Sequence, residues 1–193
     1  MSSGVTLRAK SCVAAALAVV SLGAAAVPAT AAPLTTVRMF AYDPGNDETR
    51  RVAGPLTFEF KQQLVFTTLL KIRSTEAQAT AVVVPAPEKD LGPGGLTALI
   101  GANAPERDLF VIKDEAEGPA MIAAFCPGSK HAWVAIGRIR ANRDLRVHII
   151  GDGPQPGQAH VCHTLDFYFH GEWKTEVPFE VNPREVKKPH FPY

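Results

Sequence analysis

The sequence predicts a single α+β domain dominated by antiparallel strands, folded as a sandwich or a curved sheet with one or two short helices and a single disulfide. Three observations support this: apolar and polar residues alternate with a period of two, Gly/Pro-rich turns separate the alternating runs, and only two cysteines follow the N-terminal segment. Short alternating runs between turns are typical of half-buried strands that pair with their sequence neighbours. An all-β domain is the second choice.

Residues 1–31 have the pattern of a cleaved secretory signal peptide. Arg8 and Lys10 precede an alanine-rich apolar run that ends at Pro28, and residues 29–31 supply the small side chains that signal peptidase accepts. A retained anchor is the alternative, but a membrane span needs about 20 apolar residues and this run is shorter. We therefore expect export to the periplasm or the extracellular space, with no membrane span after cleavage.

Beyond the signal, residues 32–177 are expected to form one β-rich globular domain, and residues 178–193 a Pro-rich extended tail. The whole chain carries 20 Lys and Arg against 19 Asp and Glu, and two of the basic residues belong to the signal. This near balance gives no electrostatic reason to expect nucleic acid as a partner. Two cysteines in an exported chain favour a disulfide between Cys126 and Cys162.

The first half of the domain predicts a meander. Residues 35–42 form a β-prone run, and Asn46 or Asp47 can cap a short helix that reaches Ala53. Residues 56–60 alternate with period two. Residues 64–72 either prolong that strand through a bulge or form a second strand after a tight connection, and residues 77–85 return.

The second half opens with a Gly/Pro-rich loop at residues 85–95, followed by one or two helical turns at 96–101 and a buried strand at 109–112. A helix is expected over Pro119–Cys126, with Pro at a first helical position and Met121, Ile122 and Phe125 facing the core. Residues 131–139 form the next strand.

The last two strands are expected to form a hairpin over residues 144–170, with a loop at Gly151–Gln158. The simplest register places His148 near Cys162 and Arg146 near Thr164, although a one-residue slip would change these pairs. Four arginines lie just before or within this hairpin: Arg138, Arg140, Arg143 and Arg146. They can grip phosphate or carboxylate groups, or form a solvated face paired with Asp144 and Asp152; we favour the solvated face.

The far end of the hairpin is the candidate binding patch. Its members combine aromatic rings with polar groups, as binding surfaces for a protein, peptide or saccharide do: His148, Asp166, Tyr168, His170 and Trp173. The ordinary closing contacts of a sheet would use the same residues, so the patch is a hypothesis.

Metal binding is a competing hypothesis, in which His148, His160 and Cys162 converge on one face. A disulfide at Cys162 removes the thiolate that such a site needs, and no cofactor or metal site is expected.

Known catalytic patterns are absent from the sequence, and no catalytic residue is assigned. Cys126 follows a helix, where the dipole disfavours a thiolate, and Ser74 and Ser129 lack the motifs of serine enzymes. Asp166 with Glu172 or Glu59 could form a carboxylate pair, but nothing fixes their separation.

The sequence therefore predicts a non-enzymatic exported binding or envelope-structural module. The alternatives are a small periplasmic hydrolase that uses Asp166, His148 or His170 in an open cleft, and a His-based metal-binding protein.

Overall fold

The structure, a computed structural model, describes residues 34–63, 66–155 and 157–178. The strands are β1 (Leu34–Pro44), β2 (Leu56–Gln63), β3 (Phe66–Ser74), β4 (Ala79–Pro85), β5 (Asp108–Ile112), β6 (Ala132–Ile136), β7 (Leu145–Asp152) and β8 (Ala159–Pro178). The helices are α1 (Asp47–Val52), the 3-10 helix η1 (Glu88–Leu91), α2 (Gly95–Ile100) and α3 (Gly118–Phe125). The predicted signal segment and, beyond Pro178, the predicted tail lie outside the described residues. None of the described helices is long and apolar enough to cross a membrane.

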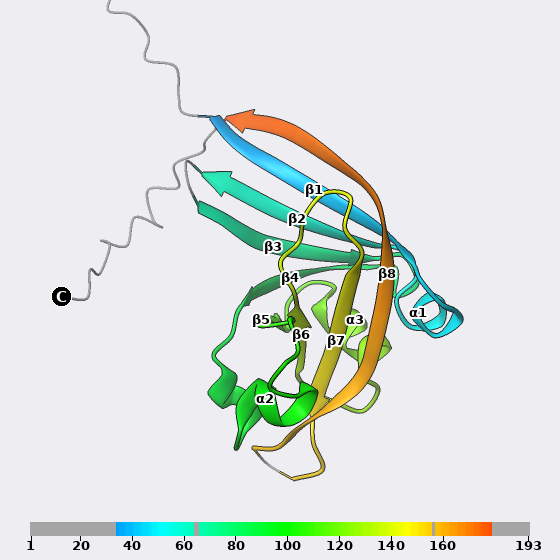
Figure 1. Cartoon of the computed structure of the whole chain (residues 1–193), viewed down its shortest axis with the longest axis vertical. Coiled ribbons are helices and arrows are strands. Elements are labelled where there is room, and N and C mark those ends of the chain that lie inside the picture. Colours follow the sequence, from blue (N-terminus) through cyan, green and yellow to red (C-terminus); the bar gives the residue numbers. More distant parts are fainter. Residues whose placement is uncertain (1–33, 64–65, 156, 179–193) are drawn as a thin grey trace, which may run out of the picture. The chain divides into compact units, whose positions relative to one another are not determined.

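The strands close into one antiparallel barrel in sequence order (Figure 1). Every strand pairs with the next, and β1 completes the ring by pairing with β8 from Leu34 opposite Pro178 to Pro44 opposite Phe167. The antiparallel, strand-dominated fold with few short helices is confirmed, whereas the expected sandwich or curved sheet is replaced by a closed barrel. Closure depends on this contact between the two ends of the domain, which local alternation does not encode.

Local patterns predicted most elements well. Asn46 caps α1, since its side-chain Oδ1 accepts a hydrogen bond of 2.8 Å from the backbone N–H of Thr49. Of the two possibilities for residues 64–72, the second strand is right, because β3 pairs antiparallel with β2. The 85–95 loop contains η1, a turn of 3-10 helix that the sequence pattern did not predict.

The barrel interior is filled by the inward-facing residues of the strands. They form one apolar cluster that includes Leu56, Phe58, Ile72, Ala81, Val83, Ile112, Val134, Ile136, Val147, Ile149, Leu165 and Phe167. Tyr42 belongs to this cluster and meets Phe58 and Phe169 edge-on. Its buried hydroxyl has no hydrogen-bond partner among the described residues. Burial, and next the charge of Asp144, raise the pKa of Tyr42 to about 12.

Helix α3 covers one end of the barrel, which we call the closed end. Met121, Ile122 and Phe125 are buried in the same cluster as the strand residues, as the sequence predicted. The predicted disulfide joins Cys126, directly after α3, to Cys162 near the start of β8. The helix is therefore tied to the wall that it covers.

A second apolar cluster lies on the outer wall, where η1 and α2 cover β5, β6 and β7. It contains Leu91, Leu96, Leu109, Trp133, Ala135 and Ile150. Trp133 and Ala135 thus face outward while their neighbours Val134 and Ile136 face inward, which explains why every residue of β6 is buried. The segment from η1 to residue 107 forms a partial second layer over this side of the barrel (Figure 1).

The β7–β8 hairpin is confirmed, but its expected register is wrong. His148 lies opposite Thr164, not near Cys162, and Arg146 lies opposite Asp166, not Thr164. Two features cause the shift. Strand β7 continues to Asp152, which shortens the expected loop, and a β-bulge puts one extra residue on β8 between the partners of Ile149 and Ile150. That extra residue is Cys162.

Candidate functional site

The barrel is hollow at the end opposite α3, which we call the open end. A cavity of about 830 Å³ lies there, a volume within the range of small-molecule sites. Its lining comes from six strands and from the β6–β7 connection: Arg38, Phe40, Phe60, Thr67, Thr68, Leu69, Pro85, Asp108, Phe110, Ile136, Gly137, Arg138, Ile139, Arg140 and Ala141. We call this space the mouth cavity.

Aromatic side chains form much of the apolar part of the mouth cavity. Phe40 of β1 and Phe60 of β2 meet edge to face, with ring centroids 5.6 Å apart, and Phe110 of β5 contributes a third ring. Phe40 is a buried member of the main core cluster, and Phe60 and Phe110 are partly buried residues that pack against it. The cavity is thus the unfilled continuation of the core.

One arginine of the mouth cavity is already paired with a carboxylate. The Arg38 guanidinium lies 2.7 Å from the Glu172 carboxylate and 5.0 Å from the centre of the Phe40 ring. Lys174 approaches the same carboxylate at 3.5 Å. Burial acts to raise the pKa of Glu172, but the hydrogen bond and charge of Arg38, followed by Lys174, outweigh it and hold that pKa below its usual value.

This network predicts that the wild type loses free energy of unfolding as the pH falls, and that the Glu172→Gln variant loses less. A carboxyl with a depressed folded-state pKa stabilises the fold above its unfolded-state pKa of about 4.5, and this stabilisation disappears as the pH falls through the lower folded-state pKa. Urea unfolding at about pH 7 and about pH 3 measures the difference. Glu176→Gln, a change of an exposed residue on the same strand, is the control. Equal acid losses in wild type and Glu172→Gln would contradict the prediction.

Two other arginines of the mouth cavity have no partner among the described residues. Arg138 and Arg140 are exposed, and neither forms an ion pair or side-chain hydrogen bond with a described residue. Both belong to the segment 137–141 between β6 and β7, all of which lines the cavity. Ile139 between them packs against the core, which fixes this segment at the rim.

The expected pairing of the arginine cluster is wrong in its partners. Arg146 pairs with Asp166 at 2.8 Å, an ion pair whose hydrogen bond raises the pKa of the guanidinium. Asp144 instead accepts a hydrogen bond from the backbone N–H of Phe169, and Asp152 accepts those of Lys130 and His131. The cluster is therefore divided: Arg138 and Arg140 line the mouth cavity, Arg146 is paired, and Arg143 is an exposed residue that lines neither cavity.

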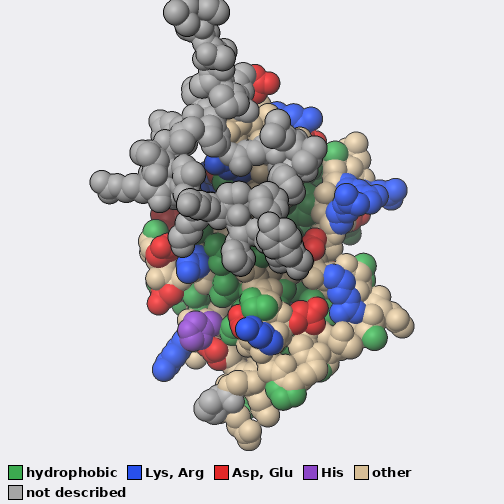
Figure 2. Space-filling view, turned by 90° about the vertical axis from the view of Figure 1, so that its left-hand side faces the viewer, with side chains coloured by type: hydrophobic (Ala, Val, Ile, Leu, Met, Phe, Trp, Pro, Cys, Tyr) green, Lys and Arg blue, Asp and Glu red, His purple; other side chains and the backbone are tan. Residues whose placement is uncertain are grey.

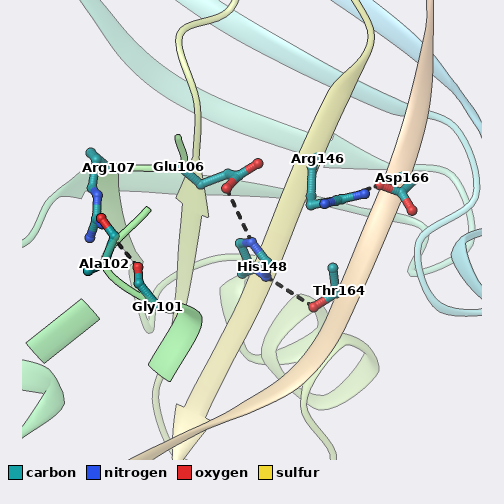
Figure 3. A network of polar contacts seen from close by, with 8 residues as sticks. All are labelled: Gly101, Ala102, Glu106, Arg107, Arg146, His148, Thr164 and Asp166. Carbon is teal, nitrogen blue, oxygen red and sulfur yellow. Dashed lines mark hydrogen bonds and ion pairs between the residues drawn. The ribbon is translucent and has the colours of Figure 1, made fainter. Parts of the chain in front are cut away.

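His148 of the predicted patch is a buried residue of the outer wall (Figure 3). Its Nε2 lies 3.5 Å from the carboxylate of Glu106, and its Nδ1 shares a hydrogen bond of 3.0 Å with Thr164 Oγ1. Glu106 is only 5% exposed and belongs to the loop between α2 and β5, whose Arg107 side chain donates to the backbone carbonyls of Gly101 and Ala102. These contacts fasten the loop to β7.

Asp166 and Tyr168 line a second, smaller cavity of about 460 Å³ beside this network. The ion pair of Arg146 with Asp166 borders it, together with Glu106 and Asp144. The predicted site is therefore concave at this point, but the histidines expected to join it do not line it.

His170 and Trp173 lie further along β8. The His170 Nδ1 is 2.8 Å from Asp43 Oδ2, and the two rings stack with centroids 6.2 Å apart. Tyr168 is 58% and Trp173 49% exposed, so both remain available as surface contacts. Neither His170 nor Trp173 lines either cavity.

The competing hypothesis, in which His148, His160 and Cys162 converge on a metal, is not what the structure shows. His160 does approach sulfur, at 3.5 Å from Cys162 Sγ, and Cys126 completes a compact group of three. Both sulfur atoms belong to the disulfide, so neither is a thiolate ligand. His148 lies opposite Thr164 instead.

The nominal carboxylate and serine candidates also have separate partners. Glu172 pairs with Arg38, Asp166 with Arg146, and Glu59 approaches Lys71 at 3.9 Å. Ser129 Oγ donates to Cys126 Sγ, and Ser74 Oγ to the backbone carbonyl of Ala53. These contacts give each group a structural partner.

Comparison with protein-family models, with curated proteins and with solved structures finds no match. The site is therefore described by its own geometry.

Proposed function

We propose that the protein is an exported, non-enzymatic binding module that takes a small molecule into the mouth cavity. The observation that carries the proposal is the cavity itself: about 830 Å³ of space at the open end, continuous with the core and lined by Phe40, Phe60 and Phe110. Inward-facing rings that stop short of filling a barrel leave apolar surface for a ligand to cover. The disulfide accords with an oxidising, exported location.

The composition of the cavity favours binding over hydrolysis. Its described lining contains three arginines, two threonines and Asp108, but no histidine, cysteine or serine that could serve as nucleophile or base. The residues of the hydrolase alternative have less support. His148 is held between Glu106 and Thr164, and His170 is held by Asp43.

The proposal predicts that filling the cavity abolishes uptake of an uncharged apolar probe. Thr67 lines the cavity and is exposed, so Thr67→Trp adds a large side chain without disturbing the buried core. N-phenylnaphthylamine, which fluoresces in apolar surroundings, should bind the wild type saturably, and Thr67→Trp should weaken it by about tenfold or more.

Thr175→Trp is the matched control, because Thr175 is exposed on β8 and does not line the cavity. Its affinity for the probe should equal that of the wild type. Probe binding that is absent in the wild type, or unchanged by Thr67→Trp, would overturn the proposed function.

A further inference from the structure

The mouth cavity has an uneven distribution of charge. Arg138 and Arg140 present two guanidinium groups without a described protein partner, whereas Asp108 is the one carboxylate residue in its described lining. Arg38 is less available to a ligand, because its guanidinium is paired with Glu172. The cavity therefore combines apolar rings with an excess of positive charge.

The arginines of the described lining that have no described partner lie on one wall. Arg138 and Arg140 both come from the β6–β7 connection, while the rings come from β1, β2 and β5. Figure 2 shows apolar side chains exposed on one face of the molecule with charged side chains around them. A molecule that satisfies both parts of the cavity needs an apolar body and an anionic group at one end.

Guanidinium groups are suited to that anionic group. A planar fork of N–H donors matches the oxygens of a carboxylate, sulfonate or phosphate monoester, and such charge-assisted hydrogen bonds are about twice as strong as neutral ones. Arg138 and Arg140 gain this interaction without breaking an ion pair with any described residue. Arg38 would first have to leave Glu172.

We propose that the ligand of the mouth cavity is an amphipathic anion, with its apolar body against Phe40, Phe60 and Phe110 and its anionic group on Arg138 and Arg140. The inference rests on the proposed function and adds the chemical class of the ligand. The assignment of Arg138 and Arg140 favours the gripping alternative for this pair over the solvated face that the sequence favoured.

Two probes with the same apolar body separate the inference from the proposed function. Anilinonaphthalene sulfonate carries a sulfonate that N-phenylnaphthylamine lacks, and both report burial by fluorescence. With the full chain, the sulfonate probe should bind more tightly than the neutral one. Arg138→Ala combined with Arg140→Ala should weaken the sulfonate probe by roughly tenfold and leave the neutral probe within about twofold.

Two further variants sharpen the assignment. Arg143→Ala removes the same charge from the same connection but from a residue outside the cavity, so it should change neither probe. Glu172→Gln frees Arg38 inside the cavity, and the sulfonate probe should then bind about threefold or more tightly while the neutral probe is unchanged. Near-UV circular dichroism of each variant checks that the fold is retained.

Competitors then identify the anion. Dodecanoate and dodecyl phosphate should displace the sulfonate probe at lower concentration than dodecanol, which has the same chain without the charge. The better of the two anions distinguishes a free fatty acid from a phosphate headgroup.

The outcomes are distinct. Equal affinity for both probes, or a sulfonate affinity that does not depend on Arg138 and Arg140, would overturn the inference and leave the proposed function standing. Failure of the wild type to bind the neutral probe would overturn the proposed function. A tenfold, arginine-dependent preference for the sulfonate supports both.

Discussion

Replacing Cys126 and Cys162 together by alanine is expected to lower the free energy of unfolding by about 4 kcal/mol. The bridge joins residues separated by 36 positions, and a cross-link over a loop of this length removes conformational freedom mainly from the unfolded chain. It also holds α3 against the start of β8, so its loss frees the cover of the closed end. Urea unfolding of wild type and the double variant measures the change.

The bridge lies at the end of the barrel opposite the mouth cavity, which gives this prediction a second readout. Under conditions where the double variant is still folded, its affinity for N-phenylnaphthylamine should match that of the wild type. Serine in place of alanine is a useful check, because its hydroxyl is closer in size to the thiol. A decrease in the free energy of unfolding of less than about 1 kcal/mol would contradict the prediction that the disulfide stabilises the fold.

Gly151→Ala is expected to cost about 3 kcal/mol in the presence of the disulfide, at the upper end of the usual penalty for an overfilled core. A Cβ atom at residue 151 would collide with Cys126 Sγ and Ser129 Oγ and would lie 2.9 Å from Cys162 Sγ. The disulfide is a rigid neighbour that cannot turn away. Chemical denaturation of the single variant measures the effect.

The same substitution should be much less costly once the sulfur atoms are gone. In the Cys126→Ala, Cys162→Ala background two of the three close contacts vanish and Ser129 gains room to rotate, so Gly151→Ala should cost about 1 kcal/mol or less. Gly137→Ala is the control, because its added Cβ would meet nothing closer than 3.7 Å. Equal costs of Gly151→Ala in both backgrounds would show that the bridge does not occupy this space.

Local sequence patterns predicted the strands and helices better than their assembly. Alternation at Leu56 and Phe58 identified a strand with one buried face, and Pro119 marked the start of α3. Whether the sheet stays open depends on the pairing of β1 with β8, strands far apart in the sequence. A period-two pattern is the same in a sandwich and in a barrel, so the closure could not be read from it.

The candidate site was harder to predict for the same reason. Phe40, Phe60 and Phe110 each lie in a run that the sequence predicted as a strand, but their common cavity exists only because the barrel brings β1, β2 and β5 to one end. The bulge on β8 moved His148 away from Cys162. No sequence pattern indicated that Glu106 is buried, because it lies in a loop and its burial depends on the packing of that loop against β7.

Helix α3 also determines how the barrel can exchange its contents. Met121, Ile122 and Phe125 cover one end, and the interior behind the mouth cavity is packed. The described part of the barrel therefore does not form a channel from end to end. A ligand of the proposed kind would therefore enter and leave through the mouth cavity, so one molecule would have to dissociate before the next could bind. On this proposal, Arg138 and Arg140 at the rim would set the dissociation rate.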